Sequence, residues 1–240
     1  MIRFAMKARA LSSGHAVAIL GMHRSGTSSL AGCMEEAGVF LGEVAASNRN
    51  NPKGNRENRK IISLHKDLLK SNGGSWDDPP ATVVWQKKHQ KIRNKIISEF
   101  THHPVWGFKD PRALLALDGW LDALPNLKCV GIFRSPMLVA QSLQRRNNFS
   151  LEKGLQLWLS YNRQLIRYHD ELGFPIISFD EEADQYVEKV RKLASSMNIG
   201  LEASRISFFS PELRHIEIEG DDQLPEECEK VYADLRSRAM

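Results

Sequence analysis

The sequence has few cysteines and no long apolar segment. Its three cysteines, Cys33, Cys129 and Cys228, lie far apart and form no Cys-x-x-Cys pair, which argues against both a disulfide framework and a cysteine-ligated zinc site. The apolar run that follows the basic N-terminus, residues 16–22, is too short to span a bilayer or to form the core of a signal peptide. We therefore expect a cytoplasmic protein without a membrane span.

The charges show no strong bias either. There are 33 Lys and Arg residues against 29 Asp and Glu, a net charge of +4, and the basic residues are scattered. A nucleic-acid surface more often shows a basic block with interleaved aromatics, so we expect no nucleic-acid partner. The small positive excess suits an anionic ligand.

The length of the chain fits one domain. With 240 residues, 42% of them apolar, the chain can bury one sizeable core. We expect a single domain over residues 1–240, with an N-terminal extension at residues 1–15 and a C-terminal segment, residues 205–240, that wraps over the domain and ends in a helix.

Short apolar segments alternate with segments of helical character. The predicted strands are residues 16–20, 105–109, 128–133 and 175–179. The predicted helices are residues 27–37, 56–71, 86–100, 151–172 and 188–197, with further helices ending near residue 123 and beginning at Pro136. This alternation predicts an α/β fold of three layers, a P-loop type with a central, mostly parallel sheet flanked by helices and a ligand at the carboxyl ends of its strands.

The segment from Gly21 to Ser28 keeps the Gly-x4-Gly spacing of a Walker A loop between a strand and a helix, which is the context this motif requires. Free N–H groups and the positive end of the dipole at the start of the helix favour an anion. Thr27 stands where an ATP-using P-loop has its lysine. The cation lies within the loop instead, as Arg24, whose guanidinium can hold phosphate oxygens bidentately.

Two motifs resemble those of the sulfotransferases that use 3′-phosphoadenosine-5′-phosphosulfate (PAPS). Residues 24–28, Arg-Ser-Gly-Thr-Ser, resemble the loop that binds the 5′-phosphosulfate, and Arg134, Pro136 and Ser142 have the order and spacing of the site for the 3′-phosphate. The resemblance implies that PAPS is the donor and 3′-phosphoadenosine-5′-phosphate (PAP) the product. The residues it implies for binding the nucleotide are His23, Arg24, Ser25, Gly26, Thr27, Ser28, Arg134 and Ser142.

Catalytic residues follow from the same resemblance. The cytosolic small-molecule sulfotransferases have Lys-x-His at the second strand, whereas here Pro111 takes the place of the histidine and Lys109 remains as a second cation beside Arg24. Glu57 and Arg59 resemble the Glu-x-Arg pair of the tyrosylprotein sulfotransferases, in which the glutamate is the base, and residues 51–57 resemble a stretch of many bacterial sulfotransferases.

Glu57 is accordingly the expected general base. Asp110 is the reserve candidate, although it could equally be an ion-pair partner of Lys109 or Arg112. In the tail, Arg214 and His215 are candidates to close over the nucleotide. We expect no metal site, because the histidines show no spacing typical of metal ligands.

The expected function is transfer of a sulfuryl group from PAPS to the hydroxyl of a carbohydrate or another small molecule. One alternative is a P-loop kinase that uses ATP and magnesium, which is disfavoured by Thr27 at the lysine position and by Arg134 where a metal-binding carboxylate would stand. The other alternative is a nucleotide-binding protein without catalytic activity.

Overall fold

A parallel sheet of four strands forms the centre of the computed structural model, which describes residues 14–44, 51–199, 206–214 and 223–240. In order across the sheet, the strands are β2 (Val105–Lys109), β1 (His15–Leu20), β3 (Lys128–Phe133) and β4 (Ile176–Ser178). All three strand pairs are parallel. The predicted strands and the α/β fold with a parallel sheet are thus confirmed.

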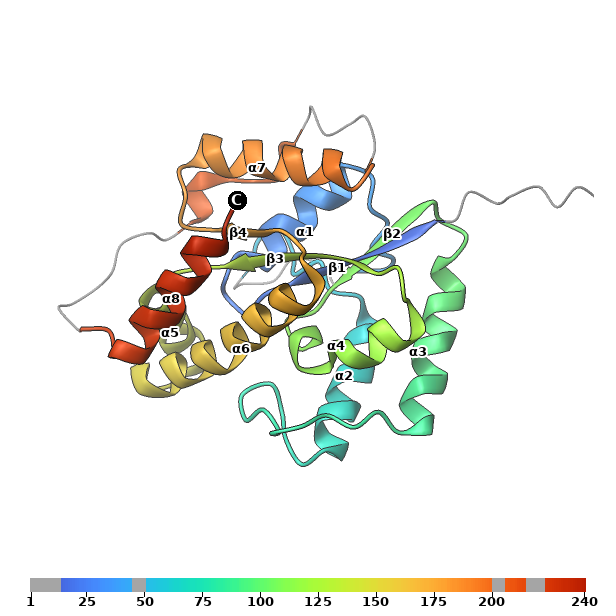
Figure 1. The fold of residues 1–240 in the computed structure, drawn as a ribbon, viewed down its shortest axis with the longest axis horizontal. Coiled ribbons are helices and arrows are strands. Elements are labelled where there is room, and N and C mark those ends of the chain that lie inside the picture. The colour runs from blue at the N-terminus through green and yellow to red at the C-terminus, as the bar shows by residue number, and fades with distance from the viewer. Residues whose placement is uncertain (1–13, 45–50, 200–205, 215–222) are drawn as a thin grey trace, which may run out of the picture.

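Helices cover both faces of the sheet (Figure 1). On one face lie α1 (Thr27–Glu36) and α7 (Ala183–Ser196). On the other face lie α2 (Arg59–Ser71), α3 (Lys87–Phe100), α4 (Ala113–Ala123), α5 (Pro136–Asn147), α6 (Leu151–Leu172) and α8 (Glu226–Arg238).

The helix predicted at residues 188–197 begins earlier, at Ala183. Tyr186 is buried one turn before Val190 and extends the apolar face of α7 towards its N-terminus. The other predicted helices appear with their ends shifted by a few residues, for instance α2, which starts at Arg59 behind the N-cap Asn58 and not at Arg56.

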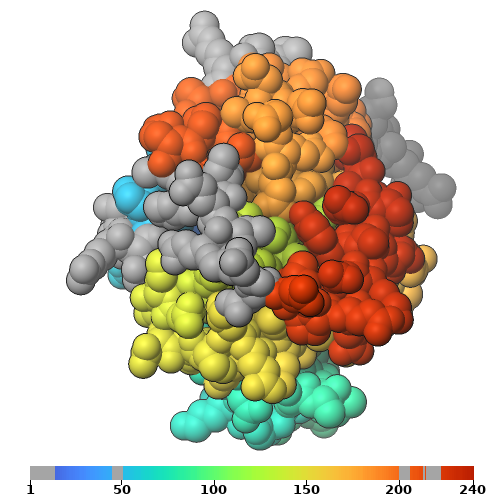
Figure 2. Space-filling view, turned by 90° about the vertical axis from the view of Figure 1, so that its left-hand side faces the viewer, coloured from blue at the N-terminus to red at the C-terminus, as the bar shows by residue number. Residues whose placement is uncertain are grey.

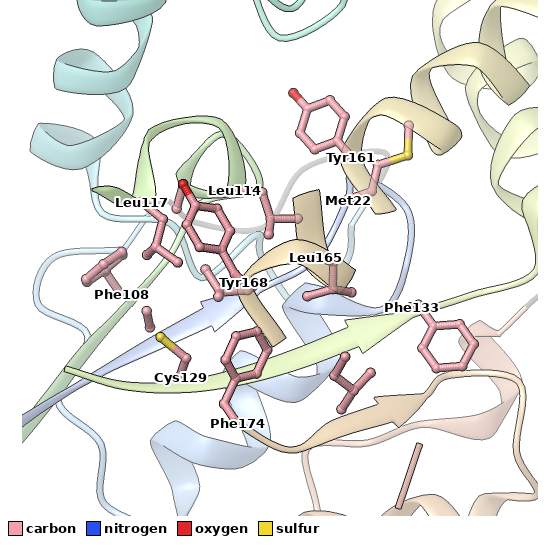
Figure 3. Packing of buried hydrophobic residues seen from close by; sticks show 14 of the residues in the cluster. Met22, Phe108, Leu114, Leu117, Cys129, Phe133, Tyr161, Leu165, Tyr168 and Phe174 are labelled. Atoms are coloured by element: carbon pink, nitrogen blue, oxygen red, sulfur yellow. The ribbon is translucent and has the colours of Figure 1, made fainter. Parts of the chain in front are cut away.

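Alternate residues of the strands fill two separate cores, one on each face. Val17 and Ile19 of β1 pack beneath α1 and α7, whereas Ala18 and Leu20 face the opposite layer. Figure 3 shows this second core, where Phe108 meets residues of α4 and α6. The three cysteines are buried and free, so in this structure they pack as small apolar side chains.

The described parts of the C-terminal region lie against the domain in two places. Residues 206–210 cross α1, where the Glu36 carboxylate accepts hydrogen bonds from the backbone N–H groups of Ser207 and Phe208. Helix α8, red in Figure 2, lies against α6, and Arg238 of α8 pairs with Asp170 of α6 at 3.0 Å. None of the helices in the described ranges is long and apolar enough to cross a lipid bilayer.

Candidate active site

Two glycines allow the loop after β1 to pass close to its neighbours. A Cβ atom at Gly21 would lie 2.4 Å from the carbonyl oxygen of Ile132 in β3, and one at Gly26 would lie 2.3 Å from the ring of Phe179. Gly26 also has a φ of +87°, a left-handed conformation that glycine adopts at little cost. The Gly-x4-Gly spacing is therefore required by steric contacts at both ends.

The start of α1 is open to an anion. Its N-cap residue is Gly26, so no side chain caps the first N–H groups of the helix. Arg24, with a left-handed φ of 68°, donates from Nε to the Ser142 hydroxyl at 2.7 Å. Burial, followed by the charges of Arg146, Arg134 and Arg145, lowers the pKa of Arg24 to about 10. An anion bound here would relieve this repulsion.

The predicted 3′-phosphate residues lie at the carboxyl end of β3. Helix α5 begins at Pro136, directly after Arg134 and Ser135, so Ser142 lies close enough to line the same pocket as Arg134. Arg134 is buried, with Nε 3.6 Å from Asp180 Oδ1. Its carbonyl accepts a hydrogen bond from the indole of Trp158 at 2.9 Å. Trp158 of α6 thus holds the backbone at the end of β3, while the guanidinium of Arg134 lines the pocket.

Lys109 and Glu57 form a buried ion pair. Lys109 Nζ donates to Glu57 Oε1 at 2.6 Å and to the Ser28 hydroxyl at 3.2 Å, and its side chain is 1% exposed. Burial lowers the pKa of Lys109, and the charge of Glu57 opposes that shift. Glu57, the expected base, and Lys109, the expected second cation, therefore lie together beside the first turn of α1.

Asp110, the reserve candidate for the base, is fully buried in a different set of contacts. The indole of Trp120 donates to His65 Nε2 at 2.8 Å. An indole N–H can only donate, so His65 carries its proton on Nδ1, which lies 2.9 Å from Asp110 Oδ2. The other oxygen, Oδ1, accepts from the backbone N–H and the guanidinium of Arg112 at 3.0 and 2.6 Å.

Asp110 is therefore held by structural partners, as the ion-pair interpretation expects, and it does not line the pocket. Burial by itself would raise its pKa, but His65 and Arg112 outweigh burial and hold the pKa of Asp110 below its usual value.

These groups surround a cavity of about 500 Å³. Its lining includes every predicted site residue except Ser25: His23, Arg24, Gly26, Thr27, Ser28, Glu57, Lys109, Arg134 and Ser142. Ser25 is fully buried, and its backbone N–H donates to the carbonyl of Met22 at 3.3 Å. A role for Ser25 in binding stays a prediction, whereas the other expected residues share one cavity.

His23 packs within an aromatic group at this cavity. Its ring centroid lies 4.4 Å from that of Trp76 and 5.9 Å from that of Tyr161. Burial, and next the charge of Arg112, lower the pKa of His23 well below its usual value. The imidazole is therefore neutral near pH 7.

Some lining residues were not predicted, among them Trp76, Arg146 and Phe179. Arg146 could have been found, because it follows Ser142 by one helical turn and so shares its face of α5. Trp76 gives a weaker signal as a tryptophan in a loop rich in Gly, Asp and Pro. Conversely, Arg59 of the Glu-x-Arg resemblance is exposed and does not line the cavity. Arg214 does line it, while His215 lies outside the described residues.

The arrangement of strands and helices is similar to that of two solved structures. The sulfotransferase domain of the Synechococcus PCC 7002 olefin synthase superposes with a TM-score of 0.51 at 16% identity, covering 95% of this chain and 90% of that chain. A sulfotransferase from Alicyclobacillus acidocaldarius also gives 0.51 at 16% identity, covering 92% and 91%. The chain has the fold of these sulfotransferases. No family model and no curated protein matches its sequence.

The network around Asp110 yields a prediction for stability. Asp110→Asn removes the charge that compensates Arg112 and accepts from His65, so we expect the variant to be less stable by on the order of 3 kcal/mol in urea unfolding at pH 7. Because the pKa of Asp110 is lowered by folding, this contribution is present above the unfolded pKa of about 3.9 and is lost as the pH falls through the folded value. The difference in the free energy of unfolding between the wild type and Asp110→Asn should therefore become smaller in acid.

Asp67→Asn is the matched control. Asp67 also contacts a histidine, His89, but its side chain is 50% exposed, so its loss should destabilise the protein much less than the loss of the Asp110 charge, because solvent screens an exposed pair. An Asp110→Asn variant as stable as the control variant would contradict the structural role.

Proposed function

We propose that this protein transfers a sulfuryl group from PAPS to an acceptor hydroxyl. The observation that supports the proposal is that two sets of hydrogen-bond donors suited to anions line one cavity, at the carboxyl ends of the adjacent strands β1 and β3, and are joined by the hydrogen bond from Arg24 to Ser142. A nucleotide that carries both a 5′-phosphosulfate and a 3′-phosphate matches two such positions, whereas ATP has no 3′-phosphate.

The residues present fit the donor. The uncapped N–H groups of α1 and the guanidinium of Arg24 suit the phosphosulfate. Arg134 and the Ser142 hydroxyl suit the 3′-phosphate. The aromatic side chains of Phe179 and Phe208, which line the same cavity, offer ring faces for the adenine.

The reaction needs an in-line displacement at sulfur. The acceptor oxygen forms a bond to sulfur, and the bond between sulfur and the 5′-phosphate oxygen breaks. The electron pair of that bond stays on the phosphate oxygen of PAP. As in phosphoryl transfer, the protein contributes by positioning and by stabilising the negative charge that develops on this oxygen. Arg24 and Lys109 supply the positive charge at this end of the cavity.

The acceptor proton passes to Glu57. Its Oε1 is held by Lys109, while Oε2 receives no hydrogen bond from the described residues, which leaves that oxygen for the acceptor. The hydrogen bond from Lys109 fixes the orientation of the carboxylate that would accept the proton as a general base. The acceptors we favour are carbohydrates, including lipid-linked glycans, and other small molecules with a hydroxyl group.

The 3′-phosphate site is tested by comparing ligands. At equal concentration PAP should raise the melting temperature far more than AMP, since a ligand that binds only the folded state stabilises it more the more tightly it binds. Arg134→Ala should weaken PAP binding by roughly 1.5–3 kcal/mol, the contribution of a charge-assisted contact, and abolish the preference over AMP.

As a control, Arg163→Ala removes an exposed arginine of α6 that pairs with Glu227 and lies outside the cavity lining. It should leave PAP binding unchanged. Equal stabilisation by PAP and AMP in the wild-type protein would refute the 3′-phosphate site.

The base is tested by Glu57→Gln. Glutamine keeps the shape and an oxygen acceptor for Lys109 but cannot take a proton, so turnover of PAPS to PAP with a panel of hydroxyl acceptors should fall by about 10²–10⁴-fold. PAP affinity should stay close to that of the wild type. Glu99→Gln, at an exposed pair with Lys60, is the control. Near-normal turnover in Glu57→Gln would show that another group accepts the proton.

A further inference from the structure

The cavity holds more positive charge than its acidic residues balance. Its charged lining consists of the cations Arg24, Lys53, Lys109, Arg112, Arg134, Arg146 and Arg214 and the carboxylates Glu57 and Glu212. The proposed donor accounts for Arg24 and Arg134 by its two anionic ends. The remaining cations differ in the contacts that they make with other residues of the protein.

Most of the remaining cations have partners within the protein. Lys109 pairs with Glu57, Lys53 donates to the carbonyl of Phe208, and Arg214 donates to the carbonyls of Phe179 and Glu181. These contacts fix the side chains where they stand. Arg112 also has a partner, because it forms an ion pair with Asp110 at 2.6 Å. Arg146 has no such ion pair with any of the described residues.

Arg112 and Arg146 keep unused capacity to donate. Arg112 gives one nitrogen to Asp110, but its Nε is buried without a hydrogen-bond partner. Arg146 donates from Nε to the side-chain oxygen of its neighbour Asn147 at 2.7 Å, and no carboxylate of the described residues forms an ion pair with it. Arg146, which forms no ion pair with a carboxylate of the described residues, carries a desolvation cost that a bound anion would offset, and the buried Nε of Arg112 offers a second donor to the same anion.

Arg112 and Arg146 line the same cavity as Glu57. Burial lowers the pKa of Arg146, the charge of Glu57 opposes this shift, and the charge of Arg112 adds to it. The Arg146 guanidinium lies 5.5 Å from the ring centroid of Trp76, which in turn packs on the neutral His23. Trp76 therefore holds Arg146 in place without neutralising it.

We propose that Arg146, with Arg112, binds an anionic group of the acceptor, so that the acceptor is an acidic hydroxyl compound bearing a carboxylate, a phosphate or a sulfate ester. The planar guanidinium fork matches the oxygens of any of these groups. The inference rests on the proposed function, because the proposed function assigns Arg24 and Arg134 to the donor. Arg146 is then a residue that determines acceptor specificity, and neutral hydroxyl compounds are poorer acceptors.

The test measures a second anion on the protein saturated with PAP. Sodium sulfate is titrated by calorimetry into the PAP complex at constant ionic strength, balanced with sodium chloride to hold screening fixed. Wild type should bind sulfate, and Arg146→Gln should weaken sulfate binding on the order of 10- to 100-fold, as expected for the loss of a charge-assisted contact. Its PAP affinity should match the wild type.

Arg145→Gln is the matched control, because it removes the same charge from the same turn of α5 at an exposed position outside the lining. It should keep sulfate binding within about twofold, roughly the scale of a surface charge contribution. Equal sulfate affinity in wild type and Arg146→Gln, or equal losses in both variants, would overturn the acceptor site.

Two further outcomes separate this inference from the proposed function. If Arg146→Gln loses PAP affinity, Arg146 belongs to the donor site, and the inference falls while the proposed function stands. If the wild-type protein binds no PAP at all, the proposed function fails first and the acceptor assignment fails with it.

Discussion

The parallel pairing of β1 with β3 is the constraint on which the site depends. It brings the loops that follow both strands to the same edge of the sheet. At that edge Gly21 lies so close to β3 that even a Cβ atom would collide with the carbonyl of Ile132. The loop after Gly21 and residues of α5 therefore line the same cavity. The contact between Arg24 and Ser142, 118 residues apart in sequence, follows from this geometry.

Buried charges complete the site at a cost in stability. Lys109 with Glu57, and Asp110 with His65 and Arg112, are almost fully removed from solvent. Such groups stabilise a fold no more, and often less, than apolar side chains of the same size would, because desolvation offsets their attraction. Their retention here has a functional explanation. The Asp110 network fixes the end of β2, and that end presents Lys109 to the cavity.

The sequence was sufficient to predict the sheet and the strand-loop-helix segment formed by β1 and α1, because short buried strands and a strand-loop-helix motif are local patterns. Tertiary contacts decided the rest. The early start of α7 depends on the burial of Tyr186 beneath the sheet. The hydrogen bond between His65 and Asp110 joins residues 45 apart in the sequence, which spacing cannot reveal. The pair of Asp110 with Arg112, by contrast, was one of the two expected alternatives. Trp76 reaches the cavity from a loop whose path no periodicity encodes. Arg146 alone could have been inferred, from its position one turn beyond Ser142.

The central claim is that one cavity holds both anionic ends of PAPS, and a crystal structure of the PAP complex tests it most directly. In that complex we expect the 5′-phosphate over the first N–H groups of α1 beside Arg24, and the 3′-phosphate within hydrogen-bond distance of Arg134 and Ser142. PAP bound with its 3′-phosphate in solvent, or with Arg134 still turned to Asp180 and away from the ligand, would contradict it.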